Sequence, residues 1–245
     1  MNPTIELLKG HRSIRQFQNR PIQTDLFQDL IKAGQAAASS NFFQAVTIIR
    51  VTDLKKRAKL ASLANNQAYV ETAAEFLVFC ADMNRAASCC DLHGAKANTG
   101  FTEQFIIATV DAALVAQNIV VASESAGLGI CYIGALRNNP SEVSTVLDLP
   151  HDTYPVFGLC LGWPDQDPEV KPRLPIDVVL RENSYGIGED GLNLCNYDEA
   201  VRGYYATRSS NQKSMSWSEQ MSGMLSKESR PHMLDFLKTK GFLQK

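Results

Sequence analysis

Two short segments of the chain carry cations at spacings that could hold a phosphate group. In the first, Arg12 and Arg15 lie three residues apart, beside the ring of His11 and the hydroxyl of Ser13. Guanidinium groups suit phosphate because they can donate two parallel hydrogen bonds. The same residues could instead complement the C-terminal end of a helix over residues 3–10. This segment alone leaves both roles open.

The second cationic segment consists of Lys171, Pro172 and Arg173. In an extended chain, residues two apart point to the same side, and proline restricts the backbone between them. Two cations are therefore presented together at low entropic cost, which suits a phosphate. A solvated arm with no ligand explains the same triplet.

A glycine-bearing segment over residues 127–134 could bring the backbone close to a flat ligand. A dinucleotide fingerprint needs its glycines between a strand and a following helix. Here Gly127 and Gly129 follow a predicted helix and precede a strand, and Tyr132 occupies the third glycine position. We therefore exclude a Rossmann site. Gly134 at the strand end permits close approach of a ligand, while a bulge or a simple turn explains it equally well.

The elements that must position these residues are predicted from apolar periodicity and from start and stop signals. One predicted helix starts with Thr24 as its cap. A second is predicted over 101–125, and it is apolar on nearly all sides. Further helices are expected over 54–63 and 140–147, and strands over 45–51, 75–81, 130–133 and 154–161. This is a mixture of α and β elements.

Beyond residue 163 the composition changes. Prolines recur at positions 164, 168, 172 and 175, so this stretch predicts an extended arm. Helices are expected over 197–207, 217–226 and 231–240, with a polar run over 208–216. Such a segment has too little apolar content for a core of its own, so we expect it to wrap around a second subunit.

The overall composition excludes several classes of partner. A formal net charge of -2 offers no broad positive field for nucleic acid or anionic membranes. The apolar stretch 105–122 is interrupted by Asp111, Gln117 and Asn118, so it predicts a core helix and no membrane span. The N-terminus has no signal-peptide pattern, which favours a cytoplasmic protein.

The six cysteines show no paired two-residue spacing, and three of them lie in apolar runs. They are expected to be reduced, as in the cytoplasm. Cys89, Cys90, Asp91 and His93 could suggest a metal site, but adjacent cysteines point apart. We therefore predict a surface loop there and no metal.

Nine motifs spread over the whole chain occur together in one order. They are HRSIRQF (11–17), SSNFFQ (39–44), NNQAYV (65–70), YIGALRN (132–138), FGLCLGWP (157–164), VKPRLP (170–175), ENSY (182–185), YYATRSSNQ (204–212) and KESRPHMLDFL (227–237). Together they resemble the nitroreductase superfamily, in particular its oxygen-insensitive NADPH nitroreductases and NADPH-flavin oxidoreductases of the flavin reductase P group.

The resemblance implies an α+β fold, with a mixed, mostly antiparallel sheet flanked by helices in an intertwined homodimer. It implies an FMN-binding core over residues 1–163, and an arm with a C-terminal helical excursion over 164–245 that completes the dimer and the NADPH site. The expected activity is ping-pong hydride transfer from NADPH through non-covalent FMN to nitroaromatics, quinones or free flavin. Two alternatives stay open: a reductase dedicated to supplying reduced FMN to a monooxygenase, and a flavin-binding module without turnover.

Site residues are carried over from the family's motifs position by position. The expected FMN contacts are His11, Arg12, Ser13, Ile14, Arg15, Ser39, Asn41, Gln67, Tyr132, Ile133, Gly134, Ala135, Lys171 and Arg173. Of these, Asn41 is expected near the partner subunit's flavin, and Arg15 or Lys171 would stabilise negative charge on the reduced ring. Phe42 is expected at the open face of the flavin and Glu103 near the acceptor.

The predicted NADPH contacts are Arg208 and Lys213, which lie in a segment without carboxylates. Ser209, Ser210 and Asn211 would add donors to the 2′-phosphate. The chain departs from the family where Asn41 replaces the usual serine and Ala135 the usual glycine. The segment 89–98 is also longer than usual, so acceptor preference is the property expected to differ most.

Overall fold

The structure is a computed structural model that describes residues 2–186, 188, 190–208 and 212–245. The chain forms two compact units, one of Met1–Asp167 with Arg230–Lys245 and one of Pro168–Ser229. The final segment belongs to the first unit because Phe236, Leu237 and Phe242 are buried in its core. The predicted division of roles between residues 1–163 and 164–245 stays a prediction.

A four-stranded sheet forms the centre of the first unit, in the order β1-β2-β4-β3. Its strands are β1 (Val46–Arg50), β2 (Glu75–Asp82), β3 (Gly129–Ile133) and β4 (Thr153–Gly162). All three pairings between these strands are antiparallel. Every residue of β2 is buried: the apolar run over 76–81 predicts this, and the carboxylates of Glu75 and Asp82 at the two ends are buried as well. The predicted fold class, a mostly antiparallel sheet flanked by helices, is confirmed.

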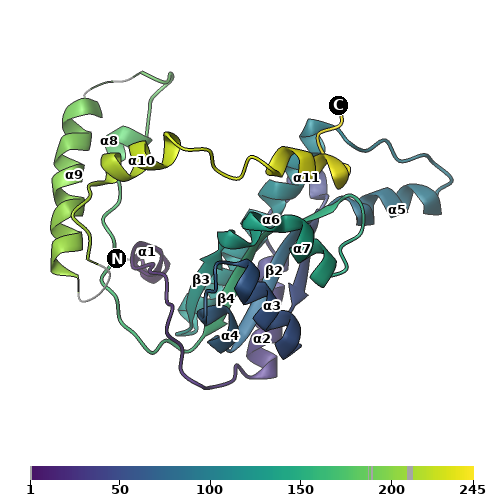
Figure 1. Cartoon of the computed structure of the whole chain (residues 1–245), viewed down its shortest axis with the longest axis horizontal. Helices are drawn as coiled ribbons and strands as arrows, with labels where there is room; N and C mark the ends of the chain where they lie inside the picture. The colour runs from purple at the N-terminus through teal and green to yellow at the C-terminus, as the bar shows by residue number, and fades with distance from the viewer. Residues whose placement is uncertain (1, 187, 189, 209–211) are drawn as a thin grey trace. The chain divides into compact units, whose positions relative to one another are not determined.

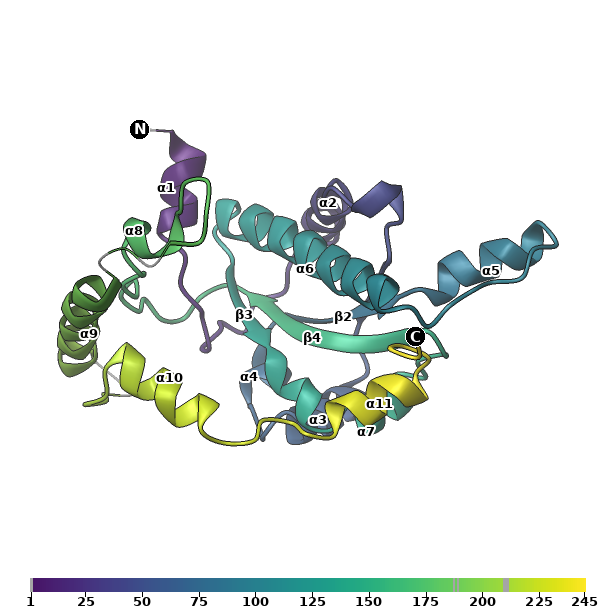
Figure 2. The same ribbon diagram turned by 90° about the horizontal axis from the view of Figure 1, so that it is seen from above.

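Two helices cover one face of the sheet, α2 (Thr24–Gln35) and α6 (Thr102–Ser125), as Figure 2 shows. They approach closely at Gly34, where a Cβ atom would lie 2.6 Å from Cγ1 of Ile119. By length and composition, α6 is apolar enough to cross a membrane. In the structure it packs against β2 and β4, and nine of its residues are buried, so it is a core helix.

The opposite face of the sheet carries α3 (Leu54–Leu63), α4 (Tyr69–Thr72) and α7 (Pro140–Val146), and α11 (Met233–Thr239) packs beside α7 (Figures 1 and 2). The carboxylate of Asp53 caps α3 by accepting from the backbone N–H groups of Lys55 at 2.7 Å and Lys56 at 3.1 Å. The first unit also contains α1 (Pro3–Lys9) near the N-terminus, η1 (Ser40–Phe42) between α2 and β1, and η2 (Gly134–Asn138) directly after β3.

The second unit contains α8 (Ile176–Val179), α9 (Asp190–Thr207) and α10 (Trp217–Leu225). Its small core consists of Tyr197, Val201 and Tyr205, with Trp217 packed against them. A capping box starts α10, since Ser216 and Glu219 each accept a hydrogen bond from the other's backbone N–H. The predicted arm is extended up to α8, whereas α9 begins earlier than the predicted residue 197.

Two local predictions are wrong. Thr24 does not cap α2: it is the first helical residue, and the residue before it, Gln23, makes no side-chain cap. Cys89 and Cys90 do not lie in a loop but in α5 (Asn84–Leu92). The start of α5 is supported by the carboxylate of Asp82, which accepts from the backbone N–H of Arg85 at 3.2 Å. Within the described ranges, no three His, Cys, Asp or Glu residues are grouped to hold a metal.

Candidate functional site

The segment that carries the first cations is anchored to the sheet through Ile14. Its backbone N–H donates to the carbonyl of Ile130 in β3 at 2.8 Å, and its side chain is buried. A Cβ atom at Gly129 would lie 2.6 Å from the Ile14 side chain, so glycine is required there. In this extended segment the neighbours Ser13 and Arg15 face away from Ile14. The sheet thus fixes where the predicted FMN contacts lie.

Three of the predicted FMN residues here already have polar partners. Nδ1 of His11 lies 2.6 Å from the Glu124 carboxylate, and Arg12 forms an ion pair with Asp167 at 2.5 Å. The backbone N–H of Arg15 donates to the side chain of Gln166 at 3.2 Å. Arg12, Ile14 and Glu124 contribute to the wall of a cavity of about 750 Å³. These contacts hold the predicted site in a defined conformation.

Arg15 also faces Tyr69, the first residue of α4. Burial raises the pKa of the Tyr69 phenol, as does nearby Cys131, while a hydrogen bond with Arg15 opposes the shift. The guanidinium of Arg15 is therefore directed to the region between α4 and β3. Tyr69 lies within the motif NNQAYV, but the sequence did not single it out.

Gln67 contributes a polar atom that is characteristic of a binding site. Its Oε1 is buried and has no hydrogen-bond partner among the described residues. Such an acceptor is costly unless a ligand or water donates to it. The isoalloxazine ring of FMN carries an N–H donor of this kind, so Gln67 fits the cofactor that the motifs imply. The contact of Gln67 with FMN stays a prediction.

The loop over residues 39–45 holds three further predicted contacts. The hydroxyl of Ser39 accepts from the backbone N–H of Gln44 at 3.2 Å, which closes the loop. Asn41 and Phe42 have φ values of 46° and 60°, in the left-handed region. The Phe42 side chain is 80% exposed, which is unusual for a large aromatic residue. This exposure suits a residue that contacts a ligand or a partner.

The end of β3 contributes mainly backbone. The side chain of Ile133 is buried in the core, so only its peptide groups are available to a ligand. Gly134 and Ala135 begin η2. Burial, with a smaller contribution from Glu124, raises the pKa of Tyr132 to about 12, so this phenol remains a neutral donor. It donates to Gln117 at 3.4 Å.

In the second unit, Tyr205 brings together three of the predicted cations. Nζ of Lys171 lies 5.3 Å from the centroid of the Tyr205 ring, Cζ of Arg208 lies 5.8 Å away and Nζ of Lys213 5.6 Å away. Burial acts to raise the pKa of Tyr205, but the hydrogen bond and charge of Lys171, with the charge of Lys213, outweigh it and lower that pKa. Sequence reasoning assigned these cations to two ligands and did not single out the tyrosine.

The remaining predicted contacts are Arg173, Glu103 and three residues of the segment 209–211. Arg173 donates to the backbone carbonyl of Lys171 at 3.2 Å, which keeps the two cations adjacent. Glu103 lies exposed in the first turn of α6. Ser209, Ser210 and Asn211 lie outside the described residues. The ligand roles of all these residues stay predictions.

The first unit combines a buried antiparallel sheet with the cationic segment 11–15, which is anchored to β3, and with the unpartnered amide oxygen of Gln67; these features suit a flat cofactor with a phosphate group. The sequence matches the model of the nitroreductase family over residues 8–163, and that of the nitroreductase family, C-terminal domain, over residues 171–245. The chain therefore belongs to the nitroreductase family.

Relatives cover the chain over its whole length. It is 49% identical to an NADPH-flavin oxidoreductase of Vibrio harveyi over 100% of both chains. It is 45% identical to an oxygen-insensitive NADPH nitroreductase of Salmonella typhimurium over 99% of both. Among solved structures, the NADPH:FMN oxidoreductase from Vibrio harveyi complexed with NAD⁺ matches 100% of both chains, with 46% identity and a TM-score of 0.92.

Proposed function

We propose that the chain is an FMN-dependent NADPH oxidoreductase that passes hydride from NADPH to nitroaromatics, quinones or free flavin. The observation that carries the proposal is the match over the full length of both chains to reductases whose names state NADPH, flavin or a nitro substrate. When bound, FMN supplies the ring that accepts and donates the hydride. The protein's own residues bind that ring, orient it and leave one face open.

Within the first unit, Gln67 provides the buried acceptor for a ring N–H, and Ser39 lies on the anchored loop. Arg15 is the cation that would stabilise negative charge developing on the reduced ring. Backbone groups from Tyr132 to Ala135 provide further contacts at the end of β3. These residues do not change covalently, so no side-chain nucleophile is required.

Within the second unit, Lys171 and Arg173 are the candidates for the FMN phosphate, and Arg208 and Lys213 for the 2′-phosphate of NADPH. Preference for NADPH over NADH requires cations that meet the 2′-phosphate. Three of these four cations, Lys171, Arg208 and Lys213, lie around the ring of Tyr205. A guanidinium and two ammonium groups provide the donors. The strictness of the preference then depends on Arg208 and Lys213.

We further propose that two copies of the chain form a homodimer. Ile106, Val110 and Leu114 lie on one stripe of α6 and are 47%, 48% and 43% exposed, although this helix is the most apolar of the fold's long elements. Phe42 and Phe43 are also exposed. Apolar surface of this kind marks an interface. A second copy is the partner that the family's intertwined architecture implies.

We also propose a cytoplasmic location. All six cysteines are free, and Cys80, Cys131 and Cys160 are buried. Unpaired cysteines are typical of proteins in a reducing compartment.

Anaerobic spectroscopy tests the proposed function. The purified protein, loaded with FMN, is titrated with NADPH, and the visible flavin absorbance is expected to bleach and to return on addition of a quinone. A yellow protein that NADPH does not bleach would instead be a flavin-binding module. Steady-state kinetics with FMN, a quinone and nitrofurazone then separate a general reductase from one dedicated to supplying reduced flavin.

A further inference from the structure

A buried carboxylate interrupts the apolar core of α6. Asp111 is 1% exposed. Its Oδ1 accepts from the backbone N–H of Ser40 at 3.2 Å, and its Oδ2 accepts from that of Ala45 at 2.9 Å. A buried charge is expensive unless it is hydrogen-bonded, so a structural reason must retain it here. Both of its donors belong to the loop over residues 39–45.

That loop is held in a conformation that its residues do not favour. Asn41, Phe42 and Gln44 have φ values of 46°, 60° and 52°. Asparagine tolerates this left-handed region of positive φ, whereas phenylalanine and glutamine are sterically strained in it. A strained backbone persists only where the surrounding structure holds it. Asp111 holds this loop by accepting hydrogen bonds near both of its ends, from Ser40 and from Ala45.

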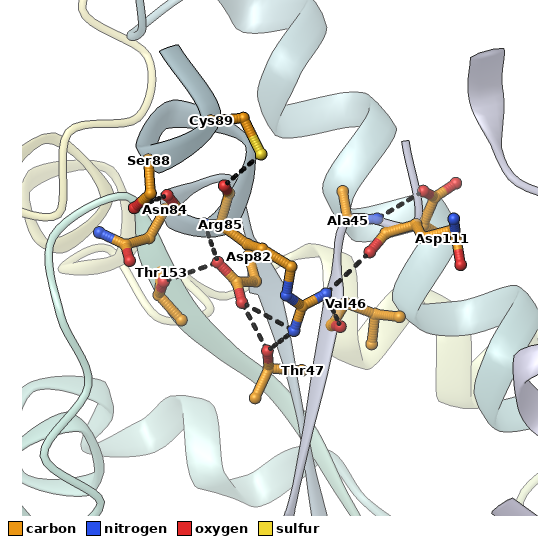
Figure 3. Close-up of polar contacts among 11 residues, drawn as sticks. Ala45, Val46, Thr47, Asp82, Asn84, Arg85, Ser88, Cys89, Asp111 and Thr153 are labelled. Carbon is orange, nitrogen blue, oxygen red and sulfur yellow. Dashed lines mark hydrogen bonds and ion pairs between the residues drawn. The ribbon is translucent and has the colours of Figure 1, made fainter. Parts of the chain in front are cut away.

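A second anchor comes from α5. The guanidinium of Arg85 donates to the carbonyls of Gln44 at 3.3 Å and Val46 at 3.2 Å. Arg85 also donates to the hydroxyl of Thr47 at 2.6 Å, and it lies 3.4 Å from the Asp82 carboxylate, which fixes its position. Figure 3 shows the chain at Ala45 and Val46 between Asp111 from α6 and Arg85 from α5.

We propose that Asp111, assisted by Arg85, is a positioning residue for acceptor selection. It fixes the N–H groups of Ser40 and Ala45, and so sets the direction of the exposed Phe42 side chain between them. This inference rests on the proposed function and on the place at the open face of the flavin that the sequence motifs predict for Phe42. Asp111 contacts neither the cofactor nor the acceptor. It acts through the loop.

Aromatic acceptors must stack beside the flavin, whereas a small inorganic oxidant such as ferricyanide need not. Displacing Phe42 should therefore affect the two kinds of acceptor differently. The isosteric variant Asp111→Asn replaces one acceptor oxygen by a donor, which opposes one of the two loop N–H groups. Loss of one bond to a charged group predicts a roughly tenfold fall in the ratio of kcat/KM for nitrofurazone to kcat/KM for ferricyanide. We expect this mainly as a higher KM for nitrofurazone.

Hydrogen exchange of the protein without FMN provides a readout that does not depend on activity. In Asp111→Asn the amides of residues 40–45 should exchange roughly tenfold faster, because one bond that holds them is lost. The matched control is Glu75→Gln, another buried carboxylate, which pairs with Arg50 at the far end of β2 from this loop. That variant should leave both the loop exchange and the acceptor ratio unchanged.

Arg85→Met provides a second variant should Asp111→Asn not fold, because the Arg85 side chain is 58% exposed and its loss does not open the core. It should raise the same exchange rates and lower the same ratio by a smaller factor. Unchanged exchange, or faster exchange with an unchanged acceptor ratio, overturns the proposal. If NADPH does not reduce the bound FMN, the proposed function fails by itself. The acceptor ratio is then measured on enzyme reduced with dithionite, and it still decides the role of Asp111.

Discussion

Replacing Lys171 by alanine gives a direct test of the phosphate site. The ammonium group of Lys171 is held beside Tyr205 and shares that surface with Arg208 and Lys213. A hydrogen bond to a charged group contributes about 1.5–3 kcal/mol. Lys171 is only partly buried and has cationic neighbours that can compensate, so the lower end applies. About 1.5 kcal/mol corresponds to a roughly tenfold weaker Kd for FMN.

The assay is titration of the cofactor-free protein with FMN, followed by the change in flavin fluorescence. Riboflavin lacks the phosphate, so its affinity should be the same in Lys171→Ala and in the wild type. Lys227→Ala removes an exposed cation of the same unit and should leave FMN affinity unchanged. Unchanged FMN affinity in Lys171→Ala, or an equal loss for riboflavin, would refute the assignment of Lys171 to the phosphate.

Three further variants address the nucleotide, the dimer and the core. In steady-state kinetics, Arg208→Ala should lower kcat/KM for NADPH by roughly ten- to a hundredfold and leave kcat/KM for NADH almost unchanged. Equal losses with both nucleotides would place recognition of the 2′-phosphate elsewhere. Val110 lies on the exposed stripe of α6, and Val110→Asp should shift the mass measured by light scattering at micromolar concentration from dimer to monomer. A wild type that is already monomeric at this concentration would exclude the dimer. Burial raises the pKa of Tyr154 to about 12, above roughly 10 in the unfolded chain, so the stability that its neutral phenol contributes is complete below pH 10 and is lost as pH rises towards 12, by roughly 3 kcal/mol in all. Tyr154→Phe should therefore reduce the fall in the free energy of unfolding between pH 10 and 12, as measured by urea unfolding. An equally steep fall in this variant would contradict the raised pKa of Tyr154.

The central elements could be predicted because their signals are local. The strands β2 and β4 are largely apolar runs, and α3, which the side chain of Asp53 caps, coincides with its predicted bounds. The helix α5 was missed because five of its nine residues, Asn84, Ser88, Cys89, Cys90 and Asp91, are weak helix formers. Its start depends on Asp82, a residue whose position the sheet determines.

The candidate site was predictable where motifs carry it and not where contacts across the chain create it. Residues from His11 to Arg15 and the pair Lys171 and Arg173 are candidates that residue type and spacing, together with the family resemblance, predict. The contacts of Asp111 could not be predicted from the sequence, because its hydrogen-bond donors lie 71 and 66 residues away along the chain. The same holds for Tyr205, which contacts Lys171 only through the packing of the second unit.

The buried sheet explains why the predicted contacts lie on loops. Both central strands are almost entirely covered, so their side chains are committed to the core and cannot reach a ligand. The loops are held by hydrogen bonds that their backbone N–H groups donate: that of Ile14 donates to Ile130, and those of Ser40 and Ala45 donate to Asp111. Because such anchors do not depend on side-chain identity, a loop residue can change while the path of the loop is kept. We therefore expect a change at a loop position such as Asn41 to alter acceptor preference and not the fold.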